Sequence, residues 1–168
     1  MGDGYLNINT LDCQNMSLSD DYGDITLKNL DISKGTVTSS DGDISIKDSL
    51  LRSTSVQADY GDINIQNTSC NNGELKLSDG DLTTAKASFS GQNTIDSSLG
   101  DIILGISADN LKQLSINAAT SLGDLKIPES LKGQITGSDD SHAYSRTTDS
   151  KNLLNVTSSD GDITITEK

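Results

Sequence analysis

Aliphatic residues recur along this chain in short alternating segments, each opened by a glycine. In residues 42–46, Gly-Asp-Ile-Ser-Ile, the third and fifth positions are aliphatic and a polar residue separates them. Alternation with a period of two is typical of a β-strand that buries one face. The third position is aliphatic in every copy: Leu6, Ile25, Ile44, Ile63, Leu82, Ile102, Leu125 and Ile163. The fifth is aliphatic in all copies but the one with Thr84: Ile8, Leu27, Ile46, Ile65, Leu104, Ile127 and Ile165.

The segments follow one another at a nearly fixed interval. Their opening glycines are Gly4, Gly23, Gly42, Gly61, Gly80, Gly100, Gly123 and Gly161. The first five are evenly spaced, the next two intervals are slightly longer, and the last equals two periods. Self-similarity at a period of roughly 20 residues is the signature of a stacked repeat. We therefore expect an all-β protein, a β-helix or β-solenoid with about 19 residues per coil and seven to eight coils.

Two further columns of buried-type residues keep the same period. One contains Cys13, Ile32, Leu51, Cys70 and Phe89, and the other contains Leu18, Val37, Val56, Leu75, Ile95 and Val156. Because coils stack at about 4.8 Å, these columns predict a thin aliphatic core. Cys13 and Cys70 lie three coils apart, roughly 14 Å, whereas a disulfide needs Cα atoms within about 7 Å. We therefore expect two free, buried thiols.

The repeat is interrupted in two places within what we expect to be a single domain over residues 1–168. Residues 105–121 are irregular, and 108–114 favour a helical turn. Residues 136–151 are polar and predict a loop or hairpin. Inserts of this kind map to one face of a solenoid and often carry binding residues. The candidate binding loop contains Asp139, Asp140, His142, Tyr144 and Arg146.

The charge of the chain limits its partners. Its 25 acidic and 12 basic residues give a net charge of −13. Nucleic acids and anionic lipids both require clustered Lys and Arg, so neither is expected as a partner. No apolar run approaches the roughly 18 residues of a membrane span, so this segment is not expected to insert into a membrane. The start at Met1 shows no signal peptide, and the chain stops just after a strand motif, which suggests a domain excised from a longer protein.

An aspartate follows nearly every repeat glycine. This column contains Asp24, Asp43, Asp62, Asp81, Asp101, Asp124 and Asp162. Glycine supplies the positive φ of a tight corner, and aspartate accepts hydrogen bonds from nearby backbone amides, so we expect a structural turn ladder. The alternative is a row that binds Ca²⁺, which needs six to eight oxygens. One column supplies too few, and the glycine pattern of the Ca²⁺-binding β-roll is absent, so no metal or cofactor is expected.

The sequence contains no recognisable catalytic motif. Walker loops, nucleophile elbows and dinucleotide fingerprints are absent, and His142 is the only histidine in a chain rich in Ser and Asp. A β-helix enzyme acting on polysaccharide remains an alternative. Such enzymes need more coils and a groove of Asp, Lys, Arg or His, and the only arginines here are Arg52 and Arg146. We expect that the protein is not an enzyme.

Residues 39–46, 59–65 and 155–165, with their Asp-Gly-Asp and Tyr-Gly-Asp segments, resemble a bacterial adhesin-like domain of unknown function of the toastrack type. The resemblance implies a single-stranded, right-handed β-helix at the cell surface or on the extracytoplasmic face of the envelope. Some such proteins are linked to envelope-stress and antimicrobial-peptide responses of the Lia and phage-shock type. The expected function is a non-catalytic interaction module for a protein, peptide or envelope glycan, with a sensor domain as the alternative. Weak self-association through the end strands is also expected.

Overall fold

The computed structural model of the protein describes residues 4–131, 133–138 and 140–168. Strands hold 71% of the residues and helix 4%, so the all-β class is confirmed. The strands wind into a β-solenoid with about 19 residues per turn, as the repeat predicts. The solenoid makes about five turns, however, and the expected seven to eight coils are not confirmed.

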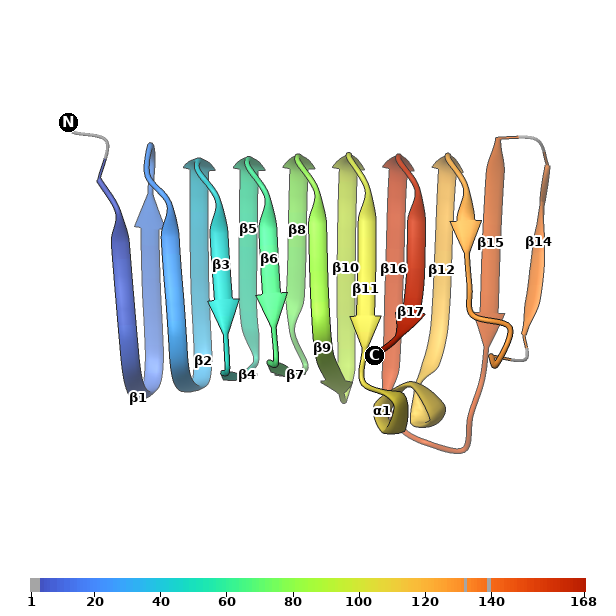
Figure 1. The fold of residues 1–168 in the computed structure, drawn as a ribbon, viewed down its shortest axis with the longest axis horizontal. Coiled ribbons are helices and arrows are strands. Elements are labelled where there is room, and N and C mark those ends of the chain that lie inside the picture. The colour runs from blue at the N-terminus through green and yellow to red at the C-terminus, as the bar shows by residue number, and fades with distance from the viewer. Residues whose placement is uncertain (1–3, 132, 139) are drawn as a thin grey trace.

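Each turn has two long sides joined by a short base (Figure 1). We call the side that starts after each repeat glycine the front, and the side that ends before the next one the back. The first two turns are long bent strands, β1 (Leu6–Asp20) and β2 (Ile25–Asp41). The later front strands are β3 (Ile44–Lys47), β6 (Ile63–Gln66), β9 (Leu82–Ser90, which bends into the base), β11 (Ile102–Ile106), β17 (Ile163–Glu167) and β13 (Leu125–Lys126).

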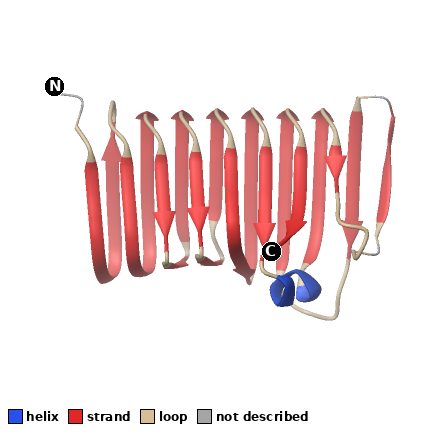
Figure 2. Cartoon of the chain, viewed as in Figure 1, coloured by secondary structure: helices blue, strands red, loops and turns tan. Residues whose placement is uncertain are grey.

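The base contains the short strands β4 (Leu50–Arg52) and β7 (Ser69–Asn71). The back is made of β5 (Thr54–Tyr60), β8 (Glu74–Asp79), β10 (Gln92–Leu99), β16 (Leu153–Asp160), β12 (Ser115–Leu122), β15 (Ser141–Arg146) and β14 (Gln134–Ser138). The helix α1 (Ala108–Gln113) lies at the base (Figure 2).

Neighbouring coils pair in parallel and in register, so like residues stack through the core. Ile44 lies between Ile25 and Ile63, and all three side chains are fully buried. Both further columns expected from the sequence are present, as Cys70 beside Phe89 and Ile95 beside Val156 illustrate. The period of the repeat therefore predicted which residues become neighbours.

The two cysteines are free thiols, as their separation predicts. Cys70 is buried, but Cys13 is only partly buried, contrary to the expectation for both. The reason lies in its position. Cys13 belongs to β1, whose one strand partner among the described residues is β2, so the first coil is covered on one side only.

The last repeat of the sequence does not lie at the end of the solenoid. After β11 the chain passes through α1, and β12 then runs two strand positions away from β10. The C-terminal strands fill this gap: β16 pairs in parallel with both β10 and β12, and β17 pairs with both β11 and β13 (Figure 1). Only the coils from β1 to β11 follow one another in sequence order. The number of repeats in the sequence is therefore larger than the number of turns in the continuous winding.

The two segments predicted to interrupt the repeat, 105–121 and 136–151, are more regular in the structure than the sequence indicates. Only residues 107–114 leave the strands, whereas 115–121 lie in β12. They continue as a strand because Ile116 and Ala118 alternate with polar residues and are buried in the core. Residues 136–151 contribute to a hairpin, in which β14 is antiparallel to β15 and β15 is antiparallel to β12. This hairpin extends the back side at the end of the solenoid opposite the N-terminus (Figure 1).

Candidate functional site

The aspartates of the repeat form a row along the corner where each back strand turns into the next front strand. The Oδ1 atom of each aspartate but the last, Asp124, accepts the backbone N–H of the aspartate in the next coil, at distances between 2.8 and 3.0 Å. The row runs in the order Asp24, Asp43, Asp62, Asp81, Asp101, Asp162, Asp124. The structure therefore brings all seven predicted residues together, and their hydrogen bonds link neighbouring coils rather than closing a turn.

The row concentrates negative charge at the spacing of the coils, about 4.8 Å. Within the described part of the chain, Lys126 is the one basic side chain that pairs with it, through Nζ 3.0 Å from Oδ2 of Asp162. The backbone N–H of Asp124, and after it the Lys126 ammonium, lower the pKa of Asp162. The same hydrogen bond raises the pKa of Lys126. Hydrogen bonds to ionised carboxylates are stronger than neutral ones, so the row stabilises the stack despite the repulsion between its members.

The glycines beside these aspartates are required by close contact between coils. A Cβ atom on Gly42 would lie 2.3 Å from the carbonyl oxygen of Gly23, and one on Gly61 would lie 2.4 Å from that of Gly42. The corresponding contact is comparably short along the whole column. The positive φ expected of these glycines is present at Gly80, Gly100, Gly123 and Gly161. Close approach of the backbones therefore explains the column more completely than backbone conformation does.

The candidate binding loop lies at the end of the solenoid opposite the N-terminus and meets the aspartate row there (Figure 1). His142 Nδ1 is 3.0 Å from the carbonyl oxygen of Gly123, the last glycine of the corner column. Asp140 is exposed, and Asp139 lies outside the described residues. The histidine is therefore held against the corner rather than free in a loop.

Two other members of the candidate loop make structural contacts. The Arg146 guanidinium donates hydrogen bonds to the carbonyl oxygens of Leu111 and Lys112, at 2.9 and 3.0 Å, at the C-terminal end of α1. A cation satisfies the unpaired carbonyls and the negative dipole at that end of a helix. Tyr144 is buried, which raises the pKa of its hydroxyl. These two residues hold the hairpin against the solenoid.

A second row of residues, not predicted from the sequence, lies on the corner between front and base. Five residues there have a left-handed backbone, with φ between 48° and 68°: Thr10, Asn29, Asp48, Asn67 and Lys86. Asn67 Nδ2 donates to Asp48 Oδ1 at 3.2 Å, so this row also links coils. An open groove of about 550 Å³ follows it, with Asp12, Asp31 and Asp48 among its lining residues. The signal was available, because Asn and Asp adopt this conformation most readily and occupy three successive copies of this position, Asn29, Asp48 and Asn67.

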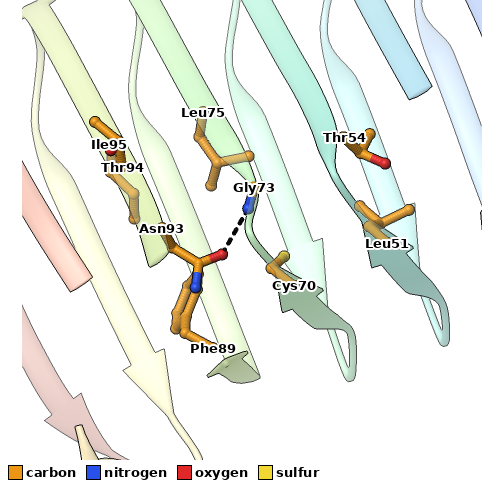
Figure 3. Close-up of a pocket in the computed structure, with 9 residues that line it drawn as sticks. All are labelled: Leu51, Thr54, Cys70, Gly73, Leu75, Phe89, Asn93, Thr94 and Ile95. Atoms are coloured by element: carbon orange, nitrogen blue, oxygen red, sulfur yellow. Dashed lines mark hydrogen bonds between the residues drawn. The ribbon is translucent and has the colours of Figure 1, made fainter. Parts of the chain in front are cut away.

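A small apolar cavity lies between the base and the back (Figure 3). Its volume is about 10 Å³, which leaves room for one water molecule at most. It is lined by Leu51, Thr54, Cys70, Gly73, Leu75, Phe89, Asn93, Thr94 and Ile95. Asn93 Oδ1 accepts the Gly73 N–H at 2.9 Å, and burial raises the pKa of Cys70 to about 12. A protonated thiol is a poor nucleophile, so Cys70 does not supply a reactive group to this cavity. The cavity is a gap in core packing.

In the part of the chain that the structure describes, none of the helices is both long and apolar enough to cross a membrane. Within the same residues, no group of three or more His, Cys, Asp or Glu is placed to hold a metal ion.

Comparison with known proteins gives one positive result. Neither the curated proteins nor the solved structures contain a match. A family model, the toastrack domain DUF4097, matches residues 1–166. It covers nearly the whole chain and agrees with the β-solenoid described above. The chain belongs to the toastrack DUF4097 family of domains of unknown function.

Proposed function

We propose that the domain is a non-catalytic interaction module that presents a fixed acidic surface to a partner at the bacterial cell envelope. The observation that carries this proposal is the row of seven aspartates along one corner. Six of its carboxylates are held by a backbone N–H of the next coil, so the charges stand at fixed positions. A preorganised surface loses little conformational entropy on binding, and its charge favours and steers basic partners.

The family resemblance supports the envelope as the location, on the cell surface or on its extracytoplasmic face. An adhesin-like role would use the corner to bind a protein, a peptide or an envelope glycan. Neither metal nor cofactor enters this proposal. Right-handed winding and self-association remain predictions.

A sensor domain of an envelope-stress or antimicrobial-peptide response is the second candidate. It is favoured by the electrostatics of the corner, where Lys126 is the one basic partner of the row among the described residues. Such a row would attract cationic peptides strongly at low ionic strength.

Binding measurements at several salt concentrations test the proposal. We expect a lysine-rich peptide to bind at low salt and to dissociate as NaCl is raised. A variant with Asp43→Asn, Asp62→Asn and Asp81→Asn should bind more weakly, because each amide oxygen still accepts the backbone N–H while the charge is lost. Absence of binding to basic peptides and envelope glycans would contradict the interaction role. Release of new reducing ends from an envelope polysaccharide would show that the domain is an enzyme.

A further inference from the structure

Exposed apolar side chains gather along one line of the surface, in the column of residues directly before the corner glycines. Tyr22, Tyr60, Leu99 and Leu122 are 58%, 65%, 48% and 53% exposed. They supply four of the seven large apolar side chains that stand exposed on the described residues. This corner runs along the top of the view in Figure 1. Exposed apolar side chains that gather along one line, rather than scattering singly over the surface, commonly mark a site of interaction.

Acidic residues alternate with these apolar residues along the column. Strand pairing places Asp41 beside Tyr60, Tyr60 beside Asp79, and Asp79 beside Leu99. Leu99 and Leu122 then lie on either side of Asp160. Tyr22 continues the column at the other end by the same offset of one period. The full order is Tyr22, Asp41, Tyr60, Asp79, Leu99, Asp160, Leu122.

The alternation depends on the insertion of the C-terminal coil. Asp160 belongs to β16, and without this strand Leu99 and Leu122 would face each other across the gap. Two positions further along each repeat lies the row of seven aspartates. We call these two rows together the corner stripe. One row alternates apolar and acidic side chains, and the other is acidic throughout.

We infer that the corner stripe is the docking site for a basic amphipathic helix of a partner protein, an inference that rests on the proposed interaction function. Charge complementarity supports this occupant. The stripe carries three carboxylates in its first row and seven in its second. It would repel an anionic lipid surface. A sugar ring stacks on tyrosine but gains nothing comparable from Leu99 and Leu122, so a polypeptide fits the whole stripe better.

The spacing of the stripe supports a helix rather than an extended segment. Apolar residues recur every second coil, about 9.6 Å apart. Along a helix, residues seven apart lie on the same face at about 10.5 Å. An extended strand covers this distance in about three residues, which places the next side chain on the opposite face. Over the four apolar residues the mismatch with a helix sums to roughly 3 Å, less than the reach of a lysine side chain.

The partner helix should therefore carry an apolar residue at every seventh position and Lys or Arg halfway between. Apolar side chains would pack around Tyr22, Tyr60, Leu99 and Leu122. The basic side chains would reach the carboxylates of the alternate coils and of the aspartate row. Both contributions are needed, because neither exposed apolar contacts nor exposed ion pairs bind strongly alone.

A synthetic helical peptide with four leucines tests the inference. It carries Leu at positions 1, 8, 15 and 22, with Lys at the third and fourth positions after each of the first three leucines, and alanine and glutamine elsewhere. We expect salt-sensitive binding at one peptide per chain, measured by calorimetry. The variant Tyr22→Ser, Tyr60→Ser, Leu99→Ser, Leu122→Ser should bind at least about tenfold more weakly. The matched control is Ile135→Ser, which removes an exposed apolar side chain of β14 away from the stripe and should bind as the wild type does.

Two further peptides keep the test independent of variant folding. A scrambled peptide of the same composition should bind the wild-type domain at least about tenfold more weakly, and a peptide with Glu in place of Lys should not bind. Equal binding of the designed and scrambled peptides would overturn the helix docking site while leaving the acidic interaction surface in place. Failure of every basic peptide to bind would overturn the helix docking site, and failure of envelope glycans to bind as well would overturn the interaction function. Dissociation of a self-associated form by the four serine substitutions, seen in sedimentation, would assign the stripe to a second copy and contradict the inference.

Discussion

Replacing Ile165 with alanine should destabilise this protein far more than replacing Ile8 with alanine. The two isoleucines occupy the same position of the repeat, in its last and first copies. If coils stacked in sequence order, both would lie in end coils and both substitutions would have similar effects. In the structure, β17 lies between β11 and β13, so Ile165 is an interior residue.

The exposure of the two side chains sets the expected magnitudes. Ile165 is 2% exposed, and truncation of a fully buried isoleucine to alanine costs about 2–5 kcal/mol. Ile8 is partly buried and its coil pairs with β2 alone among the described residues. Its truncation should cost roughly half as much, since part of its surface is already in contact with water. Urea unfolding followed by circular dichroism measures both differences in the free energy of unfolding.

Removal of residues 153–168 extends the same test. The deletion removes four side chains that are at most 2% exposed: Leu154, Val156, Ile163 and Ile165. At about 1.5–3 kcal/mol for each, the loss is roughly 6–12 kcal/mol, comparable with the whole stability of a typical domain. The shortened chain should lose its cooperative transition, and a synthetic peptide of residues 153–168 should restore it. Equal effects of the two alanine substitutions, together with a stable shortened chain, would refute the inserted position of the last repeat.

Four further outcomes follow from the corners and the core. Gly61→Ala places a Cβ against a carbonyl oxygen and should cost about 1–3 kcal/mol in urea unfolding, whereas Gly73→Ala, with its nearest atoms at 3.4 Å, should be neutral or slightly stabilising. Thiol labelling of the native protein at pH 8 should modify Cys13 and leave Cys70 unmodified until the protein unfolds, because Cys70 is buried and its pKa is raised to about 12. Labelling of both cysteines at the same rate would contradict the core packing. The lowered pKa of Asp162 adds stability that is present above the ordinary carboxyl pKa near 4 and is lost as pH falls through the folded value, so Asp162→Asn should lose less stability between pH 5 and pH 3 than the wild type does. The melting temperature should rise with NaCl, which screens the aspartate row, and respond little to millimolar CaCl₂; a large rise specific to Ca²⁺ would mean that the row binds the ion.

The sequence predicted lateral neighbours well because a fixed offset of one period determines them. Cys13 beside Ile32 and Leu75 beside Ile95 were both readable from spacing, even across the one-residue slip before Ile95. The order of the coils was not readable in the same way. The segment between Gly123 and Gly161 spans two periods, and it fits a further pair of ordinary coils as well as it fits a hairpin and an inserted strand pair. The pairing of β16 with the distant strands β10 and β12 decides between these two arrangements. The periodicity of the sequence does not indicate which distant strands pair.

The candidate site was likewise predictable only where it depends on the spacing of the repeat, and not where it depends on the stacking order of the coils. The aspartate column was identified from spacing, but the partner of each carboxylate lies in another coil and depends on the stacking order. The interruption of the repeat at 136–151 predicts the candidate loop, but two of its residues, Tyr144 and Arg146, make structural contacts. Arg146 binds the end of α1, 34 and 35 residues earlier in the chain, and no local pattern near Arg146 indicates that contact. The exposed Tyr and Leu residues before the glycines were visible in the sequence, but their alternation with aspartate was not, because it requires Asp160 to lie between Leu99 and Leu122.

The inserted C-terminal coil therefore has two effects, which single substitutions separate. Its inward residues complete the core, and its outward residues, Asp160 and Asp162, complete the two rows of the corner stripe. Ile165→Ala should lower stability and leave the affinity of the folded domain for a basic helix unchanged, since this side chain faces the core. Asp160→Asn should weaken that affinity and leave stability nearly unchanged, since the carboxylate is exposed at the corner. If Ile165→Ala weakened binding as much as Asp160→Asn did, the corner would be responding to the packing beneath it, and the stripe could not be treated as a surface fixed by the solenoid.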